Sequence, residues 1–474
     1  MKILLVKPSP KLGSVRRVHG LIFLEPLELG YVAAAVPEGH DVRMLDLRLA
    51  RRPDRAFARE LRAYRPDVVG LSGYTHEAAA VIALSRTVRE ILPEARVVVG
   101  GHHATVLPDT YNVDSVDAIV RGDGCAPFRA IVDAVADGRP FAGIPNVMVP
   151  GEPFDEKAVA ELPLYPELDD VPNPRRDLWD PTAYRCIWPS EHHPDWQTIF
   201  PPVALVRSSF GCKMECSFCV VPRLCRRRHM KRSPERVAEE IAGLPVGHVY
   251  FCDDETFIDA EHARQVAAAI EARGIQKRYF AWARTTTVIR SPELFRQWRR
   301  IGLDAVFLGF EAATDEELRG LSKHSTVADN QKAHATMREM GIAVQVGFMV
   351  RPDFTREDFE RLRQTIREMP PAQVTLTVYT PSPCSPAWYE ERDHFVCDPY
   401  ELHDCMHPLT RTTVPLAEFY REFASLVWAG AAKSPLRAGR KLVRPRDIAR
   451  VWWAAARYSR ALKRAYRDFP RELW

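Results

Sequence analysis

Residues 203–219 read VALVRSSFGCKMECSFC and join a short apolar run to three closely spaced cysteines. The run Val203–Arg207 is aliphatic and β-branched, which predicts a buried strand. The loop after it carries Cys212, Cys216 and Cys219 at CxxxCxxC spacing. Three thiolates this close in sequence can bind three irons of one [4Fe–4S] cube and leave the fourth iron open to another ligand. We therefore expect these three residues to hold such a cluster.

A structural zinc site is the alternative interpretation of the same cysteines. Zinc requires a fourth ligand, which Cys225 could supply. A zinc site explains neither the strand before the loop nor the five strands predicted after it. The cluster is therefore the favoured interpretation.

Six β/α units predict a partial (β/α)6 barrel over residues 200–385. Five further strand-like runs follow the cysteine loop, separated by helical patterns: Val249–Cys252, Tyr279–Ala283, Ala305–Gly309, Ala343–Phe348 and Val374–Val378. With the first strand they make six units, fewer than the eight of a TIM barrel. Active sites of β/α barrels lie at the carboxyl ends of the strands, which is where the cysteine loop stands.

A second β/α series occupies residues 1–150. Five short apolar runs alternate there with helical patterns: Lys2–Val6, Asp41–Leu45, Asp67–Leu71, Arg96–Val99 and Asp117–Val120. This order predicts a doubly wound (Rossmann-like) parallel sheet, whose ligands bind at the carboxyl ends of the strands. The candidate ligand contacts are the polar and glycine residues at those ends: Ser72, Gly73, Thr75, Gly100, Gly101, His102, Gly122 and Gly124.

The remaining segments are a linker and a helical C-terminal region. Residues 151–199 are rich in Pro and Asp, as in a linker that wraps over the surface. Residues 386–474 are helical in pattern, and residues 431–474 hold 13 Lys and Arg against 3 Asp and Glu. This basic tail, with Trp and Tyr along it, suits an anionic membrane surface. Packing of the same helix on the barrel, with a solvated basic face, is an equal alternative. RNA binding is a third interpretation, but the sequence has no module of aromatic residues for base stacking that would support it.

Composition limits the class of protein. The chain has 474 residues, 46% hydrophobic and 27% charged, which is typical of a globular multidomain protein. Its net charge of +4 shows no overall bias toward nucleic acid. No apolar run reaches the roughly 18 residues of a spanning helix, and the N-terminal run is too short for a secretory signal.

We expect a cytoplasmic protein, held peripherally on the inner face of the membrane if its tail binds lipid. Ten cysteines in such a compartment indicate metal or redox chemistry.

The cysteine loop and several barrel positions resemble the radical S-adenosylmethionine (SAM) superfamily. An aromatic residue, Phe218, precedes the last cysteine, as in that superfamily. Further positions match its SAM-binding elements, strand by strand: Asp253 and Asp254, Glu311 and Gly347. The resemblance implies that these residues contact SAM. Arg284 ends the third strand and could pair with a carboxylate, so it is a further candidate cofactor contact. Capping of the barrel rim is the alternative for the acidic residues, and a surface role is the alternative for Arg284. Pro381–Cys384 departs from the usual Pro-Gly-Thr.

Residues 1–385 together resemble the cobalamin-binding class B of radical SAM enzymes. Leu24–Tyr31 matches the first-helix signature of that family, and Val99–Thr105 matches its fourth-strand loop. The resemblance implies cobalamin at the strand ends of the first domain. However, Lys7–Gly13 lacks the histidine that many cobalamin domains place beneath cobalt. A degenerate domain that no longer binds cobalamin is the alternative.

The family implies a cobalamin-dependent radical SAM C-methyltransferase. In its mechanism SAM is cleaved reductively to methionine and a 5′-deoxyadenosyl radical, which removes hydrogen from an unactivated carbon. That carbon then receives the methyl group of methylcobalamin. The implied cofactors are a [4Fe–4S] cluster, SAM and cobalamin, and the implied partner is a reductant such as flavodoxin or ferredoxin. No nucleic acid is expected.

Two segments, Phe23–Leu29 and Cys397–Thr410, resemble the hopanoid C-3 methylases. This resemblance implies methylation at C-3 of a hopanoid, a bacterial triterpenoid lipid, and a lipid substrate agrees with a membrane-binding tail. One alternative is a methylase or cyclase that acts on a soluble natural product or peptide. An alternative from another class is a cobalamin-binding redox sensor without enzymatic activity.

Overall fold

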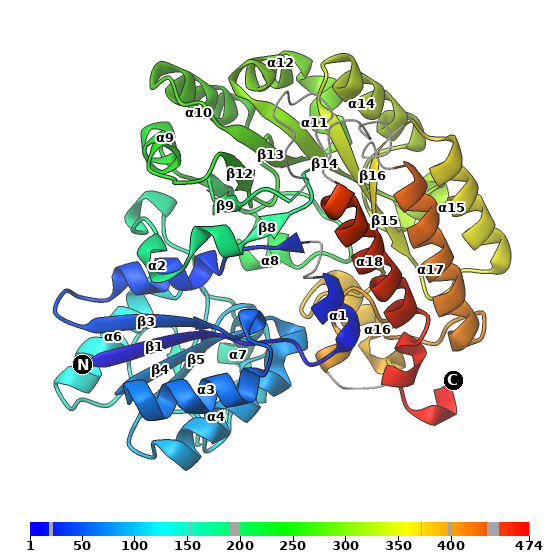
Figure 1. Ribbon diagram of the computed structural model, residues 1–474. Coiled ribbons are helices and arrows are strands. Elements are labelled where there is room, and N and C mark those ends of the chain that lie inside the picture. Colours follow the sequence, from blue (N-terminus) through cyan, green and yellow to red (C-terminus); the bar gives the residue numbers. More distant parts are fainter. Residues whose placement is uncertain are drawn as a thin grey trace.

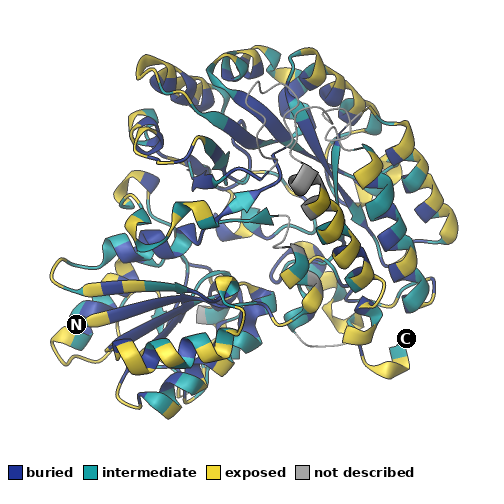
Figure 2. Ribbon diagram, viewed as in Figure 1, coloured by how far each residue is buried: buried dark blue, intermediate teal, exposed yellow. Residues whose placement is uncertain are grey.

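The computed structural model describes residues 1–18, 22–151, 153–188, 200–370, 372–396, 400–433 and 445–473. Residues 189–199 of the predicted linker, 397–399 of the hopanoid-like segment and 434–444 of the basic tail lie outside these ranges. Two six-stranded sheets form the core, each covered by helices (Figure 1). The strands are largely buried, whereas the helices expose their outer faces (Figure 2). Within the described ranges, no helix combines the length and apolarity that crossing a membrane requires.

The first sheet is doubly wound, as the sequence predicts. Its strand order is β3-β1-β4-β5-β6-β7, and all pairs are parallel except β6 with the short edge strand β7, which the sequence did not predict. The strands are β1 Lys2–Lys7, β3 Asp41–Asp46, β4 Val68–Ser72, β5 Arg96–Gly100, β6 Ala118–Val120 and β7 Val147–Met148. Helices α2 (Leu27–Ala35) and α6 (Cys125–Ala136) pack on one face, and α3 (Pro53–Tyr64) and α4 (Ala78–Ile91) pack on the other. The strand order reverses beside β1, which places a ligand crevice at the carboxyl ends of β1 and β4.

The second sheet is a partial barrel of six parallel strands in chain order. Its strands are β9 Val203–Val206, β12 His248–Phe251, β13 Arg278–Ala283, β14 Leu303–Glu311, β15 Ala343–Val350 and β16 Gln373–Val378. Among the described residues β16 does not pair with β9, so the barrel stays open and confirms the predicted (β/α)6 architecture. The outer helices are α9 Pro234–Ala242, α10 Ala260–Ala272, α12 Pro292–Ile301, α14 Val327–Glu339, α15 Arg356–Glu368 and α17 Leu416–Lys433.

Short elements connect and cap these layers. The short helices are α1 Gly13–Val18, α5 His102–Val106, α7 Glu156–Ala160, α8 Val221–Leu224, α11 Thr285–Arg290, α13 Asp315–Gly320 and α16 Pro386–Glu391. The two-residue strands are β2 Ile22–Phe23, β8 Arg185–Cys186, β10 Ser209–Phe210 and β11 Met230–Lys231. β1 runs from the outer edge of the molecule toward its middle, so the carboxyl edge of the first sheet faces inward (Figure 1).

A buried polar network joins the first domain to the barrel. The Glu25 carboxylate, just before α2, accepts hydrogen bonds from the backbone N–H of Leu205 (2.6 Å) and from Trp179 Nε1 (2.9 Å). Arg176 pairs with Glu25 and also with Glu240 on α9, the second contact being 2.6 Å long. Both carboxylates are buried, so losing Arg176 would leave uncompensated charge in the protein interior. The predicted linker thus also fastens the two domains together.

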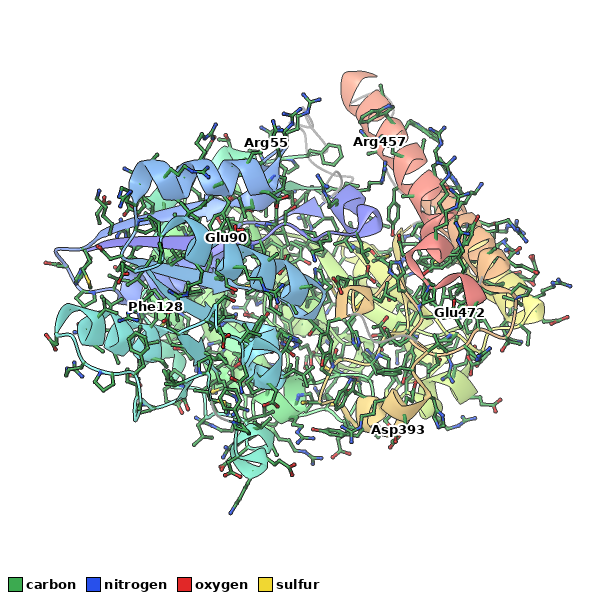
Figure 3. The ribbon with its side chains drawn as sticks, turned by 90° about the horizontal axis from the view of Figure 1, so that it is seen from below. Arg55, Glu90, Phe128, Asp393, Arg457 and Glu472 are labelled. Atoms are coloured by element: carbon green, nitrogen blue, oxygen red, sulfur yellow. The ribbon has the colours of Figure 1, made fainter. Side chains whose placement is uncertain are left out.

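The basic tail forms α18 (Pro445–Leu462), which lies against α1 and α17. Trp452 lies at the border of the packed face and stacks partly on Trp428 of α17, with ring centroids 5.7 Å apart. Four side chains of α18 and of the segment after it are buried: Tyr458, Leu462, Ala465 and Phe469. The same helix leaves Trp452 and Trp453 52% and 63% exposed. In Figure 3, α18, marked by Arg457, stands at the edge of the molecule. One face of the tail is therefore packed, and the other is open.

A doubly paired histidine holds the end of the tail. His407 Nδ1 lies 2.9 Å from Asp404 Oδ1, and its Nε2 lies 3.2 Å from Asp468 Oδ2. Burial alone would lower the pKa of His407, but the two carboxylates raise it to about 9. Because the folded pKa is above the unfolded value of about 6.5, the imidazolium stabilises the fold most below pH 6.5 and loses this effect as pH rises toward 9.

We expect His407→Gln to lower the free energy of unfolding by about 3 kcal/mol near pH 6, the size set by a shift of roughly two pKa units. The difference from the wild type should shrink steadily between pH 6.5 and 9. Denaturant unfolding at several pH values measures this trend. A difference that stays constant over the whole pH range would show that His407 acts by packing alone.

Candidate active site

Two antiparallel strands of two residues each close the cysteine loop at its base. β10 pairs antiparallel with β11, and Gly211 follows with φ 104°. A Cβ at this position would collide with the backbone carbonyl oxygen of Arg228 and lie 3.0 Å from the Cβ of Cys225, so only glycine fits the turn. Farther along the loop, the Ser217 N–H donates to the carbonyl of Leu321 (3.1 Å), and its own carbonyl accepts from Ala387 N–H (3.0 Å). The loop is therefore anchored to the carboxyl rim of the barrel.

The three predicted cluster cysteines lie together on this loop, and their chemistry fits an iron–sulfur cluster. Cys216 is buried and its Sγ accepts from Arg284 Nη1 at 3.5 Å. Burial raises the pKa of the Cys212 thiol above its usual range and raises the pKa of Cys219 to about 12, so metal binding must displace a proton from each. The described residues include no group of three His, Cys, Asp or Glu that could hold a single metal ion. A cube binds each thiolate on a different iron, so its ligands need not converge on one point.

Cys225 lies beside the loop without joining the triplet. Its Sγ is 3.6 Å from the carbonyl oxygens of both Cys212 and Pro222, which makes the thiol a weak hydrogen-bond donor. Burial raises its pKa. These contacts give Cys225 a packing role beside the loop.

Asp253 and Asp254 hold the backbone that leads into the loop. Asp253 accepts from the N–H groups of Ser208 (2.7 Å) and Ser209 (2.9 Å) and from the Ser208 hydroxyl (2.6 Å). Asp254 accepts from Gly211 N–H at 2.8 Å. Burial raises the pKa of Asp253 to about 6. The structure thus occupies Asp253 with the loop at the barrel rim, which corresponds to the capping alternative given in the sequence analysis.

Unpaired polar atoms gather near Cys216. Glu255 Oε1 accepts from Thr287 Oγ1 (2.5 Å) and the Arg284 N–H (3.3 Å), but its Oε2 is buried without a partner. Arg284 Nε is buried and unpaired as well. Next to them Lys323 Nζ pairs with Glu311 Oε1 at 2.6 Å. Buried polar groups are normally satisfied, so these atoms indicate a polar ligand beside the cysteines, and an amino acid such as SAM fits them.

Two other predicted SAM residues are explained by packing inside the barrel. A Cβ on Gly347 would meet the Phe307 ring, with Cζ 2.5 Å away, so the glycine accommodates this aromatic side chain. Phe218 packs with Leu321 and Tyr379 in a small apolar cluster at the rim. Both residues shape the walls of the site.

A cleft separates the carboxyl edge of the first sheet from the cysteine loop, and it holds about 1500 Å³ of space free of protein atoms, part of it open to solvent. Seven of the eight predicted strand-end residues line it: Ser72, Gly73, Gly100, Gly101, His102, Gly122 and Gly124. Thr75 is buried outside its lining. Gly101 has φ 92°, and a Cβ there would lie 2.7 Å from Ser72 Oγ. This glycine lets two strand-end loops pack together at the cleft wall.

The neighbouring histidines His102 and His103 differ sharply in environment. His102 lines the cleft, and burial lowers its pKa to about 4, so its imidazole is neutral at pH 7. His103 is fully buried between Tyr111 and Tyr400, with ring centroids 5.3 and 4.8 Å away. Only His102 is therefore positioned to meet a ligand in the cleft.

Several cleft residues were missed by the sequence argument: Lys7, Glu28, Tyr31, Tyr165, Arg207, Phe210 and Cys252. Lys7 ends β1 and lies 3.1 Å from Glu28 on α2. Arg207 directly follows β9. Both positions are carboxyl ends of parallel strands, and this signal could have identified them.

Family models match two parts of the chain, a B12 binding domain over residues 20–132 and the radical SAM superfamily over residues 206–366. The hopanoid C-3 methylase of Methylococcus capsulatus is 32% identical over 428 residues, covering 89% of this chain and 78% of that protein. The chain belongs to the cobalamin-binding radical SAM methyltransferases.

Solved structures show the same fold for this methyltransferase. OxsB, solved with aqua-cobalamin and SAM, superposes with a TM-score of 0.68 at 13% identity over 98% of this chain and 71% of that chain. TsrM from Kitasatospora setae, solved with cobalamin and a [4Fe–4S] cluster, superposes with a TM-score of 0.61 at 19% identity. This match covers 98% of this chain and 99% of that chain. The cofactors of this methyltransferase are a [4Fe–4S] cluster, SAM and cobalamin. The cysteine loop, the unpaired polar atoms beside it and the cleft fit these groups.

Proposed function

We propose that this methyltransferase methylates C-3 of a hopanoid. The observation that carries the proposal is the 32% identity to a hopanoid C-3 methylase across 89% of this chain. The open face of α18, with Trp452 and Trp453 exposed, supports access to a lipid at a membrane surface. Flavodoxin or ferredoxin is the proposed electron donor.

In this proposal the residues bind and orient the cofactors, which supply reductive SAM cleavage and methyl transfer when bound. The thiolates of Cys212, Cys216 and Cys219 hold the cluster. Arg284 and Glu255 offer their unpaired atoms to SAM, and the Lys323–Glu311 pair borders the same place. Asp253, Asp254, Phe218 and Gly347 fix the walls around it.

The cleft is the proposed cobalamin site. Its strand-end contacts are Ser72, Gly73, Gly100, Gly101, His102, Gly122 and Gly124. Thr75 lies just behind them, so its proposed contribution is to support the loop. The opposite wall includes residues that flank the cysteine loop, Phe210, Val220 and Val221, so cobalamin bound in the cleft would lie beside the proposed cluster site.

Lipid analysis tests the substrate. The gene is expressed in a hopanoid-producing host that lacks C-3 methylation, and the extracted hopanoids are compared by mass spectrometry with those of a host carrying Cys216→Ala. We expect hopanoids heavier by one methylene only with the wild type. Unchanged lipids together with SAM cleavage in the purified enzyme would favour a soluble natural product or peptide, or a cyclase. Absence of SAM cleavage under reducing conditions would favour a cobalamin-binding redox sensor without enzymatic activity.

The open face of α18 should contribute to membrane binding. Deleting the tail would remove buried core residues, including Leu462 and Phe469, so point substitutions are the cleaner test. We expect Trp452→Glu with Trp453→Glu to lower binding to anionic vesicles by about tenfold or more, because aromatic burial is lost and acidic charge is added. Vesicle sedimentation measures this. Leu49→Glu, at an equally exposed apolar position in the first domain, is the control. Equal binding of all variants would remove the membrane argument for a lipid substrate.

A further inference from the structure

One charged side chain in the cleft has hydrogen-bond donors that the described part of the protein does not use. Arg207 follows the first barrel strand, lines the cleft and is half-buried. Among the described residues no hydrogen bond or ion pair engages its guanidinium group. A guanidinium has five N–H donors and is always charged, so one that lines a cleft and meets no protein acceptor has its donors free for a ligand. Such a group indicates a ligand that supplies the acceptors.

Two aromatic rings fix this guanidinium in place. Its Cζ lies 5.9 Å from the ring centroid of Tyr31, on α2 of the first domain, and 5.4 Å from that of Phe210, at the start of the cysteine loop. Tyr165 packs on Phe210 in turn, with centroids 4.7 Å apart. Cation–π contacts at this range orient an arginine without using its N–H groups. The donors are therefore pre-positioned at the junction of the two domains and remain available.

The charges around the cleft indicate what kind of ligand these donors meet. Besides Arg207, the lining carries one lysine and three carboxylates: Lys7, Glu28, Asp123 and Asp254. His102 is neutral at pH 7 because burial lowers its pKa. A cleft with this mixture of signs is poorly suited to an anion and well suited to a neutral ligand rich in polar groups. Cobalamin is such a ligand, because its corrin ring carries neutral carboxamide side chains whose oxygens accept hydrogen bonds.

We propose that Arg207, held between Tyr31 and Phe210, donates hydrogen bonds to carboxamide oxygens of cobalamin and so ties the cofactor to the barrel. This inference rests on the proposed placement of cobalamin in the cleft. It adds a contact from the radical SAM domain to those expected from the strand ends of the first domain.

The test compares Arg207→Met with the wild type in two measurements on the reconstituted full-length enzyme. Hydroxocobalamin affinity, followed by absorbance, should fall about tenfold or more, the effect of losing hydrogen bonds from a charged donor. The melting temperature of the cobalamin-free protein should change little, since among the described residues Arg207 loses only two exchangeable ring contacts, which the Met side chain can replace by packing. Arg207→Lys should give an intermediate affinity, because lysine keeps the charge and loses the planar fork.

Matched variants separate this role from general damage. Tyr31→Phe keeps the ring and should bind cobalamin like the wild type, whereas Tyr31→Leu removes the ring and should weaken binding. Arg223→Met removes another arginine that lies over a tyrosine ring, 4.8 Å from the Tyr389 centroid and outside the cleft lining, and should have no effect. Unchanged cobalamin affinity in Arg207→Met, or an equal loss in Arg223→Met, would overturn the inference. A wild-type enzyme that binds no cobalamin would overturn the placement in the cleft as well.

Discussion

We expect Cys212→Ala, Cys216→Ala and Cys219→Ala each to abolish cluster assembly and SAM cleavage. Each substitution removes a thiolate from one corner of the cube, and among the described residues no other cysteine is placed to replace it on this loop. SAM cleavage then falls to background, because the open iron that would bind SAM is lost with the cube. Iron and sulfide analysis after anaerobic reconstitution, together with 5′-deoxyadenosine formation with dithionite, measures both effects.

Cys225→Ala is the matched control for the triplet. Cys225 lies beside the loop, and its thiol donates weakly to the carbonyls of Cys212 and Pro222. Its loss should therefore leave about four irons per chain, the content of one [4Fe–4S] centre. If Cys225→Ala lost metal as completely as the triplet variants, a four-cysteine zinc site would become the better interpretation.

Strand patterns could be predicted because buried parallel strands are made of continuous aliphatic runs. The predicted strand Val203–Arg207 is one residue longer than β9, which ends at Val206. The extra residue, Arg207, lines the cleft. A single charged side chain at a strand end has no periodic signal, so Arg207 and Lys7 were not identified as cleft residues. Both are cleft residues because of tertiary packing, which brings α2 of the first domain against Lys7 at the end of β1 and against Arg207 after β9.

Side-chain direction was the other information that the sequence could not supply. His102 and His103 are adjacent, but they lie in α5, where successive side chains point about 100° apart. One therefore faces the cleft and the other enters the core. The tail shows the same limit, because a basic amphipathic pattern is compatible with packing and with membrane contact, and α18 has a face for each.

Asp253→Ala is expected to have an effect nearly as large as loss of a cysteine. The carboxylate is 3% exposed and accepts three hydrogen bonds, from the Ser208 N–H, the Ser208 hydroxyl and the Ser209 N–H. Alanine leaves three buried donors unpaired, each at a cost of about 1–3 kcal/mol. Because these donors belong to the segment that leads into the cysteine loop, we expect little cluster after reconstitution and a clearly lower melting temperature.

Asp253→Asn distinguishes a loop-holding residue from a SAM ligand. The amide keeps one oxygen for the two N–H donors, and its NH₂ group can donate to the Ser208 hydroxyl, so most of the iron should be retained. If Asp253 acts by holding the loop, SAM affinity of the reconstituted variant should stay within about threefold of the wild type, since a neutral acceptor replaces the charged one at a modest cost. If the carboxylate contacts the SAM amino group directly, the variant would retain its cluster and lose SAM affinity far more strongly. Equilibrium binding of SAM, measured beside iron content, therefore shows whether Asp253 reaches the cofactor or acts through Ser208 and Ser209.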